Sequence, residues 1–459
     1  MKTLIRSVNP ATEEIIAEYP VAGSRQVERA LQLGATVFRT WRTTPLEERA
    51  LLLGRLAAWL REHRTESATI ITSEMGKPIV EAEAEVEKCA WCCQFYAENG
   101  AAMLAPQKVS STAAESYIEF PPLGMILAVM PWNFPFWQVF RFAAPALTAG
   151  NTAILKHASC VPQCALTIER AFREVGFPDG SFQTLILPGA SVSAVVEDPR
   201  IAAVTLTGSD PAGREVAAAA GRSIKKSVLE LGGSDPFVVL ADADLEAAIS
   251  TGVRARFQNA GQSCIAAKRF IIVREVFEAF RDGFATAVRN LRVGDPMDRS
   301  TQVGPLARPD LREALERQVR QTLREGASLL VGGERCSGRG FFFQPTVLSH
   351  VTVDMTACRE ELFGPVAPVL SVEDAEQAIQ AANQTPFGLG ASLWTHDPDQ
   401  ARRLAPQIEA GQVFINGMVM SDPRLPFGGV KLSGYGRELS DFGIREFVNI
   451  QTVWIGPPR

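Results

Sequence analysis

From about residue 124 onward, short apolar runs alternate with longer segments of helical periodicity. The early apolar runs are residues 125–130, 152–155, 182–187, 202–206 and 227–231. Helical segments lie between them at 163–175 and 211–220, and the order resumes with 269–273, 275–290 and 326–332. This rhythm is typical of βαβ units, so we expect an α/β fold with two successive parallel-sheet domains.

The first part of the chain has a different pattern. Residues 44–47 (Thr-Pro-Leu-Glu) read as a capping box with proline at the first helical position, and helical spacing of apolar residues follows over 51–60. A second helix is expected over 81–99. We expect the chain to cross between domains at Pro121-Pro122 and at Gly232-Gly233.

Charge and composition exclude several classes of protein. The 459 residues are 46% hydrophobic and carry a net charge of −5, so neither nucleic acid nor an anionic membrane surface is an expected partner. The uncharged stretch 120–140 contains four prolines, which favours buried core over a membrane span. Arg6 interrupts the N-terminus before an apolar signal segment, and eight cysteines are too few for a disulfide scaffold. We therefore expect a cytoplasmic protein.

Several well-known site motifs are absent. No Gly-x-Gly-x-x-Gly or Gly-x-Ser-x-Gly occurs, and the P-loop-like spacing of Gly208 and Gly213 is followed by Arg214 instead of Lys. Three neighbouring cysteines, Cys89, Cys92 and Cys93, have no histidine close in sequence, so we expect buried helix cysteines and no metal site.

Three residues stand out as candidates for catalysis. Cys264 follows Asn-Ala-Gly-Gln-Ser, whose small residues leave room beside a thiol and whose backbone amides can lower its pKa; a buried structural cysteine is the alternative. Glu230 ends an apolar strand before two glycines, where α/β enzymes place reactive groups, although a capping or surface carboxylate fits too. Asn133 lies in a turn between Pro131 and Pro135, where it can donate to an oxyanion or bond its own backbone.

Together these motifs resemble the aldehyde dehydrogenase superfamily along nearly the whole chain. In that family's order they are Pro131–Pro135, Lys156 with Pro162, Thr207-Gly208-Ser209, Glu230-Leu231-Gly232-Gly233, Gly261-Gln262-Ser263-Cys264, residues 361–365 (Glu-Leu-Phe-Gly-Pro), Asn416-Gly417 and residues 426–434. The resemblance implies a fold with two Rossmann-like domains and a bridging oligomerisation β-arm. It places the NAD(P)-binding domain at 1–106 and 124–231, the catalytic domain at 232–440, and the arm at 107–123 and 441–459, which implies a homodimer or homotetramer.

The resemblance also implies a mechanism. Cys264 would add to an aldehyde and form a thiohemiacetal, with the oxyanion held by the Asn133 amide and the Cys264 backbone N–H. A thioester would remain on Cys264 after hydride transfer, and Glu230 would activate water to hydrolyse it.

The same resemblance implies residues for the cofactor. Lys156 and Glu361 match positions that hold the two riboses, and Gly208 with Ser209 matches the turn beneath the pyrophosphate. Trp132, Leu231 and Phe363 belong to the same implied set. Ser159 stands where NAD-preferring members often have a glutamate, so NADP is expected, with NAD admitted; alternatively Ser159 caps the following helix.

Within the family, the short chain and residues 264–269 (Cys-Ile-Ala-Ala-Lys-Arg) resemble the succinate-semialdehyde dehydrogenases. Arg141 matches an arginine that binds the substrate carboxylate there, although a protein carboxylate is an alternative partner. A second arginine of those enzymes is Gln258 here, Ala266 replaces a redox cysteine, and Trp137 and Ser421 are further expected substrate contacts.

Alternatives remain. Another small aldehyde, such as glutarate semialdehyde or an aliphatic aldehyde, is the nearest rival as substrate. A thiol hydrolase or acyltransferase using Cys264 with a histidine, and a catalytically silent relative, are the remote ones; the silent relative conflicts with the presence of Cys264, Glu230 and Asn133 together.

Overall fold

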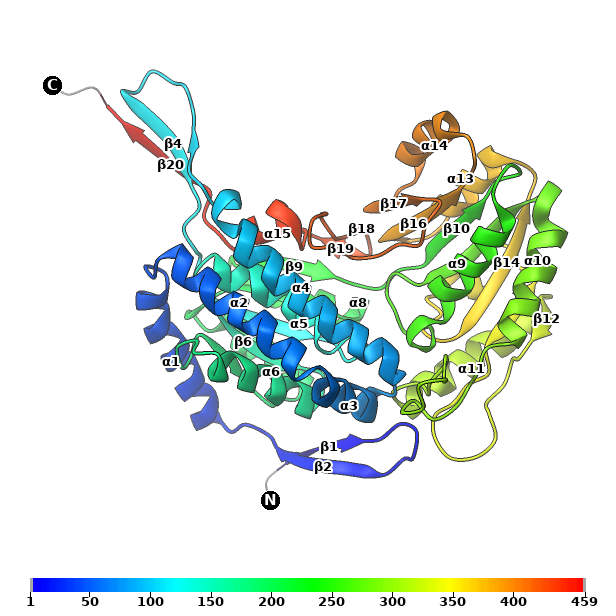
Figure 1. The fold of residues 1–459 in the computed structure, drawn as a ribbon, viewed down its shortest axis with the longest axis horizontal. Coiled ribbons are helices and arrows are strands. Elements are labelled where there is room, and N and C mark those ends of the chain that lie inside the picture. The colour runs from blue at the N-terminus through cyan, green and yellow to red at the C-terminus, as the bar shows by residue number, and fades with distance from the viewer. Residues whose placement is uncertain (1–2, 457–459) are drawn as a thin grey trace.

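The computed structural model describes residues 3–456, which form two parallel-sheet bodies and a projecting β-arm (Figure 1). The first sheet has the spatial order β19 (Gly434–Tyr435), β9 (Lys226–Glu230), β8 (Ile201–Thr207), β5 (Met125–Met130), β6 (Thr152–His157) and β7 (Phe182–Thr184). All its neighbours are parallel except β19, which runs antiparallel to β9. The second sheet has the order β12 (Ser328–Val331), β13 (Thr346–Ser349), β14 (Val366–Val372), β11 (Ala267–Val273), β10 (Asp235–Val239), β16 (Gly390–Trp394) and β17 (Gln412–Ile415).

Helices cover both faces of the first sheet because successive side chains of its strands point to opposite faces. Ile126 and Ala128 of β5 pack with α2 (Leu46–Glu62), α4 (Ile79–Met103), α5 (Trp137–Thr148) and α6 (Pro162–Glu174). Met125 and Leu127 pack on the other face with α1 (Ser24–Trp41), α7 (Val192–Glu197) and α8 (Asp210–Arg222). The predicted α/β class is confirmed.

The second sheet repeats this arrangement. Phe237 and Val239 of β10 face α9 (Leu245–Phe257), α10 (Arg274–Arg289) and α11 (Pro309–Arg324), while Val238 faces α13 (Ala375–Asn383) and α14 (Pro398–Leu404). The remaining elements among the described residues include α3 (Arg64–Met75), α12 (Thr356–Arg359), α15 (Ser440–Arg445) and the pairs β1 (Leu4–Val8) with β2 (Ile15–Pro20) and β15 (Phe387–Gly388) with β18 (Val430–Lys431).

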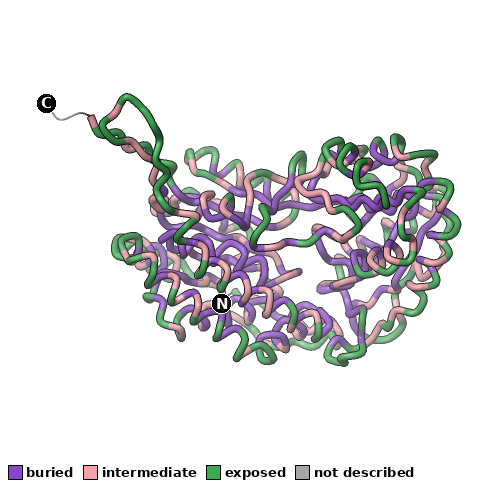
Figure 2. The backbone as a smooth tube through the Cα atoms, turned by 45° about the horizontal axis from the view of Figure 1, so that its top comes forward, coloured by how far each residue is buried: buried purple, intermediate pink, exposed green. Residues whose placement is uncertain are grey.

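The arm is a three-stranded antiparallel sheet of β20 (Gln451–Ile455), β4 (Glu115–Glu119) and β3 (Gln107–Lys108). It projects away from both bodies, and its backbone is mostly exposed or half-buried (Figure 2). Residues 457–459 of the predicted arm, and 1–2 of the predicted first domain, lie outside the described residues.

Two local details differ from the sequence expectations. No capping box starts α2: Pro45 occupies the N-cap, and the Thr44 hydroxyl donates to the Thr40 carbonyl at 3.3 Å. The predicted boundaries assign residues 232–440 to the catalytic domain. In the structure, β19 within that range pairs with β9, so the chain returns to the first sheet before residue 440. The domain boundaries themselves stay a prediction.

Candidate active site

The carboxyl ends of the first sheet's parallel strands meet at one edge. Met130 of β5 is level with His157 of β6, and Thr207 of β8 is level with Glu230 of β9. The residues that follow these strands therefore gather along this edge, which is where open α/β sheets bind ligands. It collects the predicted residues Asn133, Lys156, Ser159, Gly208, Ser209 and Glu230.

The turn 131–135 after β5 is fixed by two buried side chains. The His157 Nε2 lies 2.8 Å from the Pro135 carbonyl, and its Nδ1 lies 2.9 Å from the Ala158 N–H. Burial lowers the pKa of His157 to about 4, so the ring is neutral, donating through Nε2 and accepting at Nδ1. Glu85 accepts the N–H groups of Phe136 (2.9 Å) and Trp137 (3.0 Å) at the start of α5. The turn is thus held from α4 and β6.

The segment before Cys264 is strained. Asn259, Ala260 and Gly261 have φ values of 54°, 51° and 72°, a left-handed run that is costly for the first two residues. A Cβ at Gly261 would lie 2.3 Å from the Gly364 carbonyl oxygen, so only glycine fits there. The Asn259 side chain donates to the Asn133 carbonyl at 2.7 Å, which ties the strained segment to the turn 131–135.

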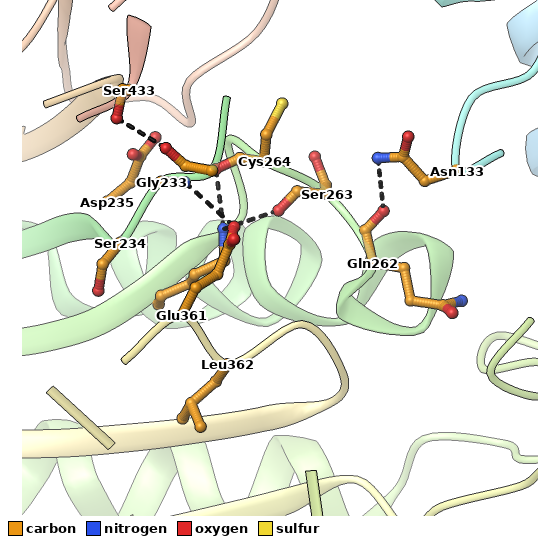
Figure 3. Close-up of polar contacts among 12 residues, drawn as sticks. Asn133, Gly233, Ser234, Asp235, Gln262, Ser263, Cys264, Glu361, Leu362 and Ser433 are labelled. Carbon is orange, nitrogen blue, oxygen red and sulfur yellow. Dashed lines mark hydrogen bonds and ion pairs between the residues drawn. The ribbon is translucent and has the colours of Figure 1, made fainter. Parts of the chain in front are cut away.

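Asn133 points at the cysteine loop. Its Nδ2 donates to the Gln262 carbonyl at 3.1 Å, and its Oδ1 has no hydrogen-bond partner among the described residues (Figure 3). An amide NH₂ carries two hydrogens, so one remains for another acceptor. The alternative of a turn asparagine that bonds only its own backbone does not describe this geometry.

Cys264 borders a cavity and is partly exposed to it. Burial raises the pKa of its thiol to about 12, and the nearby charges of Arg141 and Lys268 lower it less. The shift is opposite to the lowering that neighbouring backbone amides can cause, because desolvation of the thiolate is its largest cause. The resting thiol is protonated and needs a base.

Glu230 is the buried carboxylate of the site. It is 1% exposed, and neither oxygen has a hydrogen-bond partner among the described residues. Burial raises the pKa of Glu230 to about 8; Arg141 opposes this shift and Glu438 adds to it. A carboxyl with this pKa exchanges protons near neutral pH, which suits a general base better than a surface or capping role.

Lys268 joins the cysteine loop to Glu361, a contact that the sequence analysis missed. Its Nζ donates to the carbonyls of Ser263 and Cys264, both at 2.8 Å, and lies 2.9 Å from Glu361 Oε1. The same Glu361 oxygen accepts the Gly233 N–H at 3.1 Å (Figure 3). The available signal was a lysine followed by an arginine at the start of a fully buried strand.

The cofactor edge carries an unbalanced cation. Lys156 is 8% exposed, and no carboxylate of the described residues forms an ion pair with it. Ser159 is exposed in the turn after β6, and the N-cap of α6 is Val161 with no side-chain cap, so Ser159 is not the helix cap. A buried ammonium at the end of β6 and an exposed hydroxyl in the turn after it fit a ribose or a phosphate group.

The other cofactor candidates border the same edge. Ser209 is the exposed N-cap of α8, and its side chain makes no capping bond, so backbone N–H groups of the first turn remain available for an anion. Leu231 packs against Gly213 of that helix. Trp132 and Phe363 meet edge to face with ring centroids 5.7 Å apart. These residues fit a bound dinucleotide.

A cavity of about 460 Å³ opens beside Cys264. Its walls include all four predicted substrate residues, Trp137, Arg141, Gln258 and Ser421, and also Lys88 of α4, which the sequence analysis did not single out. The signal for Lys88 was a charged residue among the buried cysteines of that helix.

Arg141 forms an ion pair with Glu438, and both side chains are almost fully buried. Its Nη2 also donates to Thr207 Oγ1 at 3.3 Å, and its guanidinium lies 4.5 Å from the Phe427 ring centre. Of the two partners that the sequence left open, the structure shows the protein carboxylate. Glu438 reaches Arg141 because Phe427 and Glu438 exchange both backbone hydrogen bonds, each 2.7 Å, a pairing that local sequence does not reveal.

Two other expectations concern metal and membrane. Residues 3–456 contain no group of three or more histidine, cysteine, aspartate or glutamate side chains arranged to hold a metal ion. Cys89, Cys92 and Cys93 are buried and unpaired in α4, which confirms the structural interpretation. No helix in the described part of the chain is both long and apolar enough to span a bilayer.

Two parallel-sheet domains that meet at a cysteine, with a dinucleotide-type edge beside it, define a cysteine-dependent α/β oxidoreductase. Residues 1–453 match the aldehyde dehydrogenase family, to which the chain therefore belongs.

Similar proteins include the NAD(P)+ succinate semialdehyde dehydrogenase Sad of Escherichia coli K12, 52% identical over 98% of this chain and 97% of the relative. The NADP+ succinate-semialdehyde dehydrogenase 1 of Mycobacterium tuberculosis H37Rv is 50% identical over 98% and 99%. A crystal structure of the Streptococcus pyogenes succinic semialdehyde dehydrogenase with NADP+ superposes with a TM-score of 0.97, at 36% identity, covering 99% of this chain and 100% of the other. The predicted family and fold are confirmed.

Proposed function

We propose that this enzyme oxidises succinate semialdehyde to succinate, with NADP as the preferred acceptor and NAD admitted. The observation that carries the proposal is the cavity of about 460 Å³ that holds Cys264 among cationic and hydroxyl side chains. The names of the similar enzymes support the same substrate and cofactor.

In the proposed reaction, the Cys264 sulfur bonds to the aldehyde carbon and the carbonyl oxygen becomes an oxyanion. The free N–H of the Asn133 amide and the backbone N–H of Cys264 stabilise that oxyanion. Because the resting thiol has a pKa of about 12, its proton must leave as the bond forms, and Glu230 is the nearby acceptor with a pKa of about 8.

When bound, the nicotinamide supplies an acceptor for the hydride that leaves the former aldehyde carbon. Cys264 then carries a thioester. Glu230 first passes the thiol proton to solvent and then removes a proton from water, and the hydroxide attacks the thioester carbon. The C–S bond breaks, and the departing thiolate takes that proton back from Glu230, which releases the acid and the thiol. Lys156, Ser159, Gly208 and Ser209 hold the nucleotide in this proposal, together with Trp132, Leu231, Glu361 and Phe363.

The acyl-transfer rivals lack an essential group in this cavity. Among the described residues that line it, none is a histidine, so a Cys–His hydrolase has no base there.

An assay separates the alternative substrates. Purified enzyme is given succinate semialdehyde, glutarate semialdehyde or butanal, each with NADP and with NAD, and the absorbance of reduced nicotinamide is measured. We expect the highest kcat/KM with succinate semialdehyde and NADP. Equal kcat/KM for butanal would refute the proposed substrate.

The arm supports an oligomeric enzyme. Ile450, Trp454 and Ile455 are 64%, 55% and 45% exposed in a single chain, which is costly unless another subunit covers them. We propose a homodimer or homotetramer, tested by light scattering of the full chain and of Trp454→Glu, which should shift toward monomer.

A cytoplasmic location is proposed from the eight cysteines, none of which forms a disulfide in the described residues.

A further inference from the structure

Lys88 is an ammonium inside the substrate cavity. It extends from α4 so that Nζ lies 4.3 Å from the ring centre of Trp137 and donates to Ser421 Oγ at 2.8 Å. Both Trp137 and Ser421 also line the cavity beside Cys264. No carboxylate of the described residues forms an ion pair with Lys88.

The two carboxylates that interact electrostatically with Lys88 are already committed to other cations. Glu85, three residues earlier on α4, pairs with Lys77 and accepts two backbone N–H groups of α5. Asp422, next to Ser421, forms an ion pair of 2.7 Å with Arg424 and accepts the Arg424 N–H. Neither of these two carboxylates can become a full partner of Lys88 without leaving another cation.

The other cations of the cavity differ from Lys88. Arg141 pairs with Glu438, and Arg424 pairs with Asp422. Arg254 lines the rim but is exposed to solvent. Lys88 thus combines partial burial with an unbalanced charge, which is the condition under which an incoming anion contributes most.

We propose that the Lys88 ammonium and the Ser421 hydroxyl together bind the carboxylate of the substrate and so set the preference for an ω-carboxylated aldehyde. This inference rests on the proposed function and assigns its charge recognition to Lys88. The hydroxyl of Ser421 accepts from Lys88, so its own hydrogen is free to donate to a carboxylate oxygen. Arg141 keeps its pairing with Glu438 while the substrate is bound.

The titration of Lys88 agrees with this assignment. Burial, with a smaller contribution from the neighbouring Arg141, lowers the pKa of Lys88 to about 8. The charged and titratable groups facing it are Glu85, Cys89 and Cys92 of its own helix, Arg141 of α5 and Asp422 of the loop after β17. A bound carboxylate would restore the missing counter-charge and favour the ammonium.

The test compares kcat/KM for succinate semialdehyde and for butanal, which has the same chain length and no carboxylate. In Lys88→Met the ratio of the two values should fall by roughly 10- to 150-fold, because a charged hydrogen bond is lost in the bound state. Lys88→Arg should recover most of the ratio. Arg254→Met, which removes a cation at the rim, is the matched control and should change the ratio less than about threefold.

The outcomes separate this inference from the proposed function. If the wild-type enzyme shows no preference for succinate semialdehyde over butanal, the proposed substrate fails. If the wild type prefers it and Lys88→Met retains that preference, the assignment to Lys88 fails and the substrate stands. A parallel loss for both aldehydes that Lys88→Arg does not recover also overturns the assignment, because it indicates a structural role.

A pH series gives a second readout without substitution. In the wild type the ratio should decline above about pH 8, where Lys88 loses its proton, since steps shared by both aldehydes cancel in the ratio. In Lys88→Arg the decline should disappear because arginine stays charged. A decline that persists in Lys88→Arg would assign it to another group and overturn the inference.

Discussion

The cofactor edge and the substrate cavity are built in opposite ways. The cofactor edge uses residues at or just after the ends of strands, and its buried cation Lys156 forms no ion pair with a carboxylate among residues 3–456. The substrate cavity collects charges from α4, α5 and the segment 418–438, and most of them neutralise one another, as Arg141 and Glu438 do. At the cofactor edge, the residue types alone therefore indicate the function. In the substrate cavity, the function is indicated only by those charged side chains that have no partner of opposite charge.

The largest expected effect is at the nucleophile that both regions share. Cys264→Ala should reduce aldehyde oxidation by about 10⁴-fold or more, because no other thiol borders the cavity in the described part of the chain. NADP binding, measured by calorimetry, should stay close to wild type. Substantial residual turnover in this variant would show that the nucleophile is elsewhere.

Glu230→Gln should slow hydrolysis of the thioester by about 10²- to 10⁴-fold while slowing hydride transfer less. The amide keeps the shape of the buried side chain and removes the base. Rapid mixing should then show a burst of reduced nicotinamide equal to the enzyme concentration, followed by a slow steady state. A slow reaction without a burst would place Glu230 before hydride transfer.

Arg141→Leu tests whether this arginine serves the protein or the substrate. Removing it leaves Glu438 buried without its counter-charge, so we expect a loss of about 3–5 kcal/mol in the free energy of unfolding in urea. Turnover of succinate semialdehyde and of butanal should fall together. A loss confined to succinate semialdehyde would mean that the guanidinium contacts substrate.

Arg424→Leu is the matched control. It breaks the ion pair between Arg424 and Asp422 at the same cavity, and there the arginine side chain is 66% exposed. Its cost should stay below about 1 kcal/mol. The double variant Arg141→Leu with Glu438→Leu should recover much of the loss of Arg141→Leu, since no unpaired charge then remains buried.

The fold was largely predictable because the apolar periodicity of its strands follows from burial on both faces. The run 125–130 is β5 itself, and the runs 202–206 and 227–231 differ from β8 and β9 by a residue at each end. What the pattern could not show is a pairing between distant segments. β19 joins β9 through residues 434–435, and this return of the chain is what brings Glu438 to Arg141.

The site residues also fall into a group that could be predicted from sequence and a group that could not. Asn133 and Cys264 lie in turns framed by proline or glycine, and Glu230 ends a strand before two glycines, so their positions at the ends of strands and in turns were predictable from sequence. Lys88 and Lys268 were missed because each lies in a regular element, a helix and a strand, where a lysine usually reaches solvent. Only the tertiary structure shows that these two ammonium groups point inward.

At the cofactor edge, Ser159→Glu should raise the KM for NADP on the order of tenfold and leave the KM for NAD within about threefold. A carboxylate at this exposed turn would repel a 2′-phosphate, and salt would weaken the repulsion. Steady-state kinetics with both cofactors at two salt concentrations would measure it. Ser159→Gln is the uncharged control, and equal changes for both cofactors would place Ser159 away from the 2′ position.

The smallest expected effect is a shift in pH dependence caused by Glu438. The pKa of Glu230 is about 8, chiefly because the carboxyl is buried, with Glu438 adding repulsion and Arg141 opposing it. Glu438→Gln removes the repulsion and leaves Arg141 free to attract Glu230, so the pKa of Glu230 should fall by about one unit.

A base acts only in its deprotonated form, which is populated above its pKa. The rate of thioester hydrolysis, measured after the burst, should therefore rise through about pH 8 in the wild type and through about pH 7 in Glu438→Gln. Glu409→Gln, at an exposed ion pair with Lys431, is the control and should leave the profile in place. An unchanged profile in Glu438→Gln would show that the buried charges of the cavity do not act on the base, and that the cavity affects substrate binding alone.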